Sequence, residues 1–218
     1  MKRVAVFLGT SLMLGCQFAM AKTIEFTVPI EPQQAVPLPD PQSTASGIAT
    51  FNLHLPDNPG DETWLEYLFE FSGLDLGNMV GFPTNPQTPG NPNDDVTAIH
   101  IHNAPPGAIG EMFLGIVNPR HDFDDVMVDI LGSTISGRWE DSDVDPPSNA
   151  PKGITESLDE LFAGQLYLNV HTVGNPSSDI RAQIVVGAPE PSALVLGGIG
   201  VLLLWWHVAA RRRSDRIT

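Results

Sequence analysis

Cysteine and basic residues are scarce in this 218-residue sequence. Its single cysteine, Cys16, excludes any disulfide within the chain. Only five of the 11 lysines and arginines lie between residues 22 and 188, whereas 24 of the 26 acidic residues do. Because phosphate backbones repel such an acidic body, this balance argues against nucleic acid as a partner and favours solubility, divalent cations or basic partners.

Long apolar runs are confined to the two ends of the chain. At the first end, basic residues at positions 2 and 3 precede an apolar stretch over residues 4–15, and Ala19 and Ala21 form a small-residue cleavage site. This pattern predicts a secretory signal peptide over residues 1–21. The alternative is a lipidated Cys16, but the residues before it make a poor lipoprotein box. Cleavage after Ala21 removes Cys16, so the mature body needs a core or a ligand for its stability.

At the other end, residues 192–210 form a 19-residue apolar run that only His207 interrupts. At about 1.5 Å per residue, a helix of this length crosses a ~30 Å hydrocarbon layer. The arginines that follow place the end of the chain in the cytoplasm, and everything before residue 189 outside. A proline-glutamate-proline tripeptide stands directly before the run. The residues that define this tail are Pro189, Glu190, Pro191, Arg211, Arg212 and Arg213.

This tail resembles the PEP-CTERM sorting signal, which implies processing by an exosortase-type enzyme during export. An ordinary C-terminal anchor is the alternative. We therefore expect three parts: a signal peptide (1–21), one β domain (22–188) and a sorting signal with a transmembrane helix (189–218). The expected location is the cell envelope, the cell surface or the medium, after export across the inner membrane, with the C-terminal end transiently anchored in the membrane.

Between residues 22 and 188, short alternating segments are separated by proline, glycine, asparagine and aspartate. This pattern predicts an all-β fold, an antiparallel sandwich or barrel of about eight strands. One short helix is expected over residues 157–163, capped by Ser157 and ended by Gly164. The expected strands cover residues 23–28, 48–55, 64–71, 96–102, 112–117, 134–139, 165–171 and 180–186.

Two histidine-bearing segments carry the clearest candidate chemistry. His100 and His102 stand two residues apart, and residues two apart on a strand point to the same face. If the strand bearing His171 lies beside them, three imidazoles can form an open copper or zinc site. The alternative places these histidines at strand ends with hydrogen bonds to loop carbonyls, while Asn169 and Thr172 satisfy backbone groups nearby. We expect the three rings to lie near one another at one end of the sandwich.

Calcium is a third candidate ligand, through alternate carboxylates at Asp141, Asp143 and Asp145. Pro146 and Lys152 stand where an EF-hand needs glycine and glutamate, so this loop is no EF-hand. The mature chain contains no G-x-S-x-G elbow, no H-E-x-x-H helix and no cysteine nucleophile. We therefore assign no catalytic residue.

The motifs at residues 98–102, 164–172 and 179–183, with Gly107 and Gly110, resemble the signature of CHRD (chordin-type) domains. The similarity runs from about residue 24 to 186. It implies a β-sandwich in a secreted setting and does not imply an activity. Where the family usually shows a Gly-Glu-Ile-Arg-Gly-Gln type of ending, this chain keeps an acid at Asp179, and Arg181 is expected to serve as an internal ion-pair or hydrogen-bond anchor.

The sequence therefore favours a non-enzymatic surface or extracellular-matrix module that binds exopolysaccharide, another surface protein or a cation. The alternative is a mononuclear copper- or zinc-binding module with possible redox activity. Its histidine pair resembles those of copper/zinc superoxide dismutases, but a dinuclear centre of that kind takes six histidines and an aspartate. The body holds five histidines and no disulfide, so only a mononuclear site fits.

Overall fold

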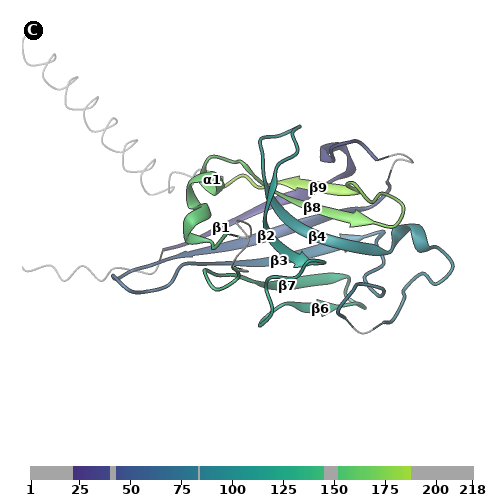
Figure 1. The fold of residues 1–218 in the computed structure, drawn as a ribbon, viewed down its shortest axis with the longest axis horizontal. Helices are drawn as coiled ribbons and strands as arrows, with labels where there is room; N and C mark the ends of the chain where they lie inside the picture. Colours follow the sequence, from purple (N-terminus) through teal and green to yellow (C-terminus); the bar gives the residue numbers. More distant parts are fainter. Residues whose placement is uncertain (1–21, 40–42, 83, 145–151, 188–218) are drawn as a thin grey trace, which may run out of the picture.

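Alternating apolar and polar side chains build two antiparallel sheets (Figure 1). The computed structural model describes residues 22–39, 43–82, 84–144 and 152–187. One sheet has the strand order β1-β2-β3-β7-β6 and the other β5-β4-β8-β9. The strands are β1 (Lys22–Ile30), β2 (Ser46–Leu55), β3 (Trp64–Ser72), β4 (Val96–Asn103), β5 (Glu111–Val117), β6 (Met127–Asp129), β7 (Thr134–Trp139), β8 (Leu166–Thr172) and β9 (Ile180–Gln183). The helical segments are η1 (Pro32–Gln34), η2 (Pro92–Asp94), η3 (Thr155–Ser157) and α1 (Leu158–Phe162).

The hydrophobic core collects the inward-facing side chains of both sheets. Phe51 of β2 and Phe69 of β3 are fully buried, with ring centroids 5.9 Å apart. From the other sheet, β4 contributes Ile99 and Ile101, which are also fully buried. Because successive side chains of a strand point to opposite faces, the residues that alternate with these two isoleucines face away from the core. This geometry turns the histidine side of β4 outward.

The observed strands confirm the all-β sandwich and correct several details. The two sheets are separate, so the barrel alternative is wrong. Among the described residues there are nine strands rather than about eight, because β6 was not expected. This strand has three residues and pairs only with β7 at the edge of its sheet, so it carries too few buried positions for a period-two signal. Figure 1 shows β6 beside β7 at the lower border of the molecule.

The expected helix is present as a 3₁₀ turn followed by α1, and its predicted cap is wrong. The Ser157 hydroxyl does not cap the helix and instead donates to the Gly153 carbonyl oxygen at 2.9 Å. Ser157 is fully buried, and a serine hydroxyl bonded to a carbonyl four residues back competes with capping. The predicted end is correct, since Gly164 adopts a φ of 66° directly after the helix.

Both terminal segments lie outside the described residues. The expected signal peptide with Ala19 and Ala21 falls there, as do the Pro-Glu-Pro tripeptide, the apolar run at residues 192–210 and the arginine cluster. In the part of the chain that the structure describes, no helix has the length and apolarity to cross a membrane. The signal peptide and the sorting tail therefore stay predictions.

Candidate metal site of three histidines

Strand pairing brings the three predicted histidines together. In the antiparallel β4–β8 pair, His100 lies opposite Asn169, and His171 lies opposite Ala98, one step along the same face. The ring centroids of His100 and His102 are 5.5 Å apart, and those of His100 and His171 are 5.1 Å apart. The predicted proximity is confirmed, but the predicted position is wrong. The rings lie on the outward face of the four-stranded sheet, within the strands, because the alternate residues of β4 enter the core.

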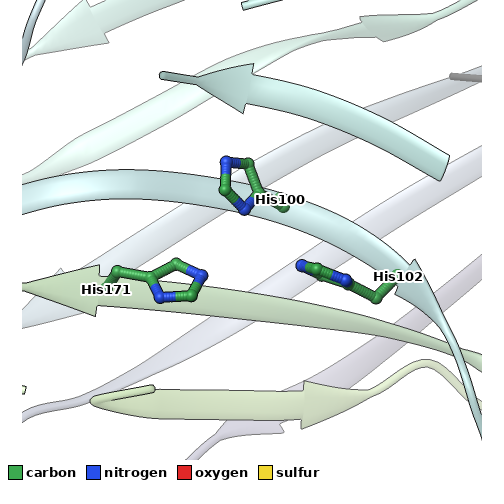
Figure 2. Close-up of side chains that lie close together, drawn as sticks. All are labelled: His100, His102 and His171. Carbon is green, nitrogen blue, oxygen red and sulfur yellow. The ribbon is translucent and has the colours of Figure 1, made fainter. Parts of the chain in front are cut away.

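The three rings face one small space. Figure 2 shows a nitrogen of each histidine pointing toward the gap between the rings. One candidate ligand atom per ring can be chosen so that all three lie within 4.8 Å of one another. Tetrahedral coordination at about 2 Å needs nitrogens about 3.3 Å apart, so modest side-chain rotation is enough to enclose an ion.

Backbone carbonyls orient all three rings. Each ring places one nitrogen at hydrogen-bond distance from a loop carbonyl oxygen: His100 Nε2 and Asn118 (2.9 Å), His102 Nδ1 and Gly110 (3.1 Å), and His171 Nδ1 and Pro176 (3.0 Å). A carbonyl oxygen only accepts, so each of these nitrogens carries the proton. In the neutral ring the other nitrogen then bears a lone pair. Metal-binding histidines typically donate their second N–H in this way.

The protein satisfies the remaining nitrogens unequally. The Nε2 atom of His102 is buried and has no hydrogen-bond partner among the described residues. The Nε2 atom of His171 accepts from the Asn169 amide at 3.1 Å, and the Asn169 amide oxygen accepts from the Ser178 hydroxyl. An unpaired buried acceptor is costly, so the His102 lone pair points to a ligand that the protein does not supply. The carbonyl bonds of the alternative interpretation are present, but they use only one nitrogen of each ring.

Burial keeps the three imidazoles neutral. Desolvation is the main cause that lowers the pKa of His100 to about 4, and the neighbouring histidines contribute to this lowering. Desolvation also lowers the pKa of His102 and that of His171, and the positive charge of Arg181 adds to the effect at His102. All three rings are therefore deprotonated at neutral pH, which is the form that binds metal ions.

An aromatic and cationic stack adjoins the histidines. The rings of His102 and Tyr167 are stacked, with centroids 5.1 Å apart and planes 11° apart. Arg181 belongs to the neighbouring strand β9, and its guanidinium carbon lies 3.5 Å from the Tyr167 ring centroid. Arg181 is only 2% exposed and donates to the carbonyl oxygens of Ala108 and Pro105. It forms no ion pair with any acidic side chain in the described part of the chain.

The CHRD domain family model matches residues 26–184. The chain belongs to the CHRD domain family. No curated protein and no solved structure matches the chain. CHRD domains are typically extracellular or secreted.

Gly110 shows why glycine stands in the CHRD motif. A Cβ atom at this position would clash with the Asn103 carbonyl oxygen. Because Gly110 has no side chain, the loop can lie against β4. There the Gly110 carbonyl oxygen lies at hydrogen-bond distance from His102 Nδ1, and the Gly110 N–H donates to the Tyr167 hydroxyl at 3.2 Å. The glycine therefore positions the ring of His102.

Two further predicted residues stabilise the loop that presents Pro176. The Thr172 hydroxyl is buried and accepts from the Asn175 N–H at 3.1 Å. The carboxylate of Asp179 accepts from the Ser43 hydroxyl at 2.9 Å and from the Asn175 amide at 2.5 Å. Neither side chain has a described hydrogen bond to the histidines, so both act on the loop and not on the candidate ligands.

His121 lies beside the site but was not among the site residues predicted from the sequence. The Gly115 N–H donates to His121 Nδ1 at 3.0 Å, and Gly115 is the β5 residue opposite His100. A Cβ atom at Gly115 would lie 2.7 Å from that nitrogen, so glycine leaves the space that the imidazole fills. The turn-forming pair Asn118-Pro119 was the available signal, since it returns the chain toward β5.

Two of the three carboxylates of the candidate calcium loop accept from local backbone groups. The Asp141 carboxylate accepts from the Thr155 N–H at 2.8 Å, whereas the Asp143 carboxylate accepts from the Glu140 N–H at 2.7 Å. Asp145 lies outside the described residues. The two carboxylates each satisfy a local backbone group, and they are not part of a described ligand group.

Proposed function

We propose that this CHRD domain is a non-enzymatic binding module, exported to the cell surface, that holds one copper or zinc ion between His100, His102 and His171. One observation carries the proposal: three neutral imidazoles each turn a nitrogen toward a common space, while a backbone carbonyl fixes the other nitrogen of each ring. A fourth coordination position stays open to water or to a donor from a partner.

The surface location rests on the two ends of the sequence. The signal peptide would direct export, and the PEP-CTERM tail would be cut by an exosortase-type enzyme. The acidic surface suits a hydrated extracellular matrix, where exopolysaccharide or another surface protein would be the partner. A bound ion with an open position is one way for such a module to take a donor group from that partner.

The test is metal analysis of the full chain purified in detergent, followed by titration with copper and with zinc at neutral pH. We expect one ion per chain. The double variant His100→Ala/His102→Ala is expected to lose it. His54→Ala is the matched control, since His54 stacks on Trp64 and lies outside the candidate site. Equal metal content in the wild type and the double variant would refute the proposal, provided that thermal melting shows both to be folded.

A further inference from the structure

The candidate ligand set carries no negative charge. All three donors are neutral imidazoles, and no carboxylate joins their group among the described residues. The ion pairs found in the described ranges do not involve His100, His102 or His171. Nothing described at the site therefore offsets the charge of a bound cation.

The fixed charge that adjoins the site is positive. Arg181 is almost completely buried and stacks on Tyr167, which in turn stacks on His102. A guanidinium stays protonated at any accessible pH. Its contacts are carbonyl oxygens, the Gln183 amide oxygen and an aromatic ring, and none of these cancels its full charge.

The charge of the ion therefore affects its binding here more strongly than its preference for nitrogen donors does. Imidazole suits both copper and zinc. The desolvation free energy of an ion rises with the square of its charge. It is therefore about four times larger for a divalent ion than for a monovalent ion of equal size. Repulsion from Arg181 is twice as large for the divalent ion. A neutral three-nitrogen set beside a buried cation favours a single positive charge.

Building on the proposed function, we infer that the site takes copper as the monovalent ion Cu(I), in preference to Zn(II) and Cu(II). Three imidazoles supply a three-coordinate environment for Cu(I) without any anionic ligand. Binding is a simple association, with no electron transfer at the protein.

The affinities are compared on the full chain in detergent. Cu(I), kept reduced with ascorbate in the absence of oxygen, is titrated against the competing chelator bicinchoninate. Zn(II) and Cu(II) are titrated against chelators of known affinity. We expect Cu(I) to bind at least tenfold more tightly than Zn(II), with the signal absent from His100→Ala/His102→Ala. Tighter binding of Zn(II) or Cu(II) would overturn this inference and leave the proposed metal site intact, whereas no binding of any ion would overturn both.

The substitution Asn169→Asp tests whether the lack of negative charge at the site causes the preference for Cu(I). This nearly isosteric change places a carboxylate where the amide now lies 3.1 Å from His171 Nε2, and it keeps an acceptor for the Ser178 hydroxyl. We expect the Zn(II) affinity to rise at least tenfold relative to that of Cu(I). Asn58→Asp is the matched control, because it adds the same charge in the exposed turn between β2 and β3. An unchanged ratio in folded Asn169→Asp protein would show that charge does not set the preference.

Discussion

Single residues determine how precisely the candidate site is built, and Gly110 is the clearest case. A side chain here would collide with the Asn103 carbonyl oxygen and push the chain away from β4. We expect Gly110→Ala to lower the free energy of unfolding by about 3 kcal/mol and to weaken metal binding, because the carbonyl that orients His102 moves. Gly90→Ala, where no atom lies within 4 Å of the added methyl group, is expected to change neither value. Urea denaturation and metal titration measure both effects.

Asp143 makes the free energy of unfolding depend on pH, and the sign of this effect follows from its raised pKa. Burial raises its pKa from 3.8 to about 7, so between about pH 4 and 7 the folded chain keeps a proton that the unfolded chain releases. The contribution is fully present below pH 4 and is lost as the pH rises through 7. The lowered histidine pKa values act in the opposite direction, so a comparison of variants is needed to isolate it.

We expect Asp143→Asn and the wild type to differ little in stability at pH 4, and the variant to be more stable by on the order of 2 kcal/mol at pH 8. An asparagine oxygen still accepts from the Glu140 N–H, so the local hydrogen bond is retained. Urea denaturation across this pH range is the measurement. Asp57→Asn, at an exposed position, reports the general effect of removing one acid. A constant difference between wild type and Asp143→Asn would contradict the prediction.

For single residues, the sequence indicated the three candidate ligands and, in the alternative interpretation, hydrogen bonds from them to loop carbonyls, but it did not indicate which carbonyls. The spacing of His100 and His102 was informative because strand geometry is periodic. The carbonyls of Asn118, Gly110 and Pro176 left no such signal, since every residue has a carbonyl and only the folded loop path decides where it points. His121 was missed for the same reason.

Among the elements, the connection between β5 and β6 links the two sheets. Beside the histidines it supplies Asn118, and at the other sheet the buried Asp122 carboxylate accepts from the Tyr67 hydroxyl of β3 at 2.7 Å. Burial raises the pKa of Asp122 to about 6, so this carboxyl is held in a poorly solvated position. The Tyr67 hydroxyl is therefore important for the conformation of the whole connection.

We expect Tyr67→Phe to cost about 1–3 kcal/mol of unfolding free energy, because it leaves the Asp122 carboxyl buried without its donor. Asp122→Asn keeps an acceptor for the hydroxyl and is expected to cost less. Thermal melting and denaturant titration compare the two variants. If Tyr67→Phe were as stable as the wild type, the hydrogen bond would not be needed to hold this connection.

Strand positions were predictable from alternation, and the exceptions have local causes. The expected segment at residues 134–139 coincides with β7, whereas β9 ends at Gln183 rather than at residue 186. Short edge elements such as β6 bury too little to leave a periodic pattern. The Ser157 cap failed because the buried hydroxyl donates to the Gly153 carbonyl oxygen and accepts from no N–H of the first helical turn.

For the whole molecule, the two ends of the sequence predict how the chain reaches its location. We expect replacement of Pro189, Glu190 and Pro191 by alanine to leave the chain uncut and in the membrane fraction, because the exosortase-type enzyme would lose its recognition sequence. Cell fractionation with blotting for the CHRD body measures this. Wild-type distribution of the variant would favour an ordinary C-terminal anchor. Asn58→Ala lies in an exposed turn far from the tail in sequence. It is the control for effects of substitution on expression and export that do not involve the tail.

The three carbonyls that orient the histidines come from three different loops, and this has a consequence for divergence and for design. Loop side chains could vary widely without disturbing the rings, whereas a one-residue insertion or deletion in any of these loops would redirect a carbonyl and its imidazole. Homologues that keep all three histidines but differ in loop length would then hold the three rings in a different arrangement. Transplanting the site onto another sandwich would require the loops together with the histidines.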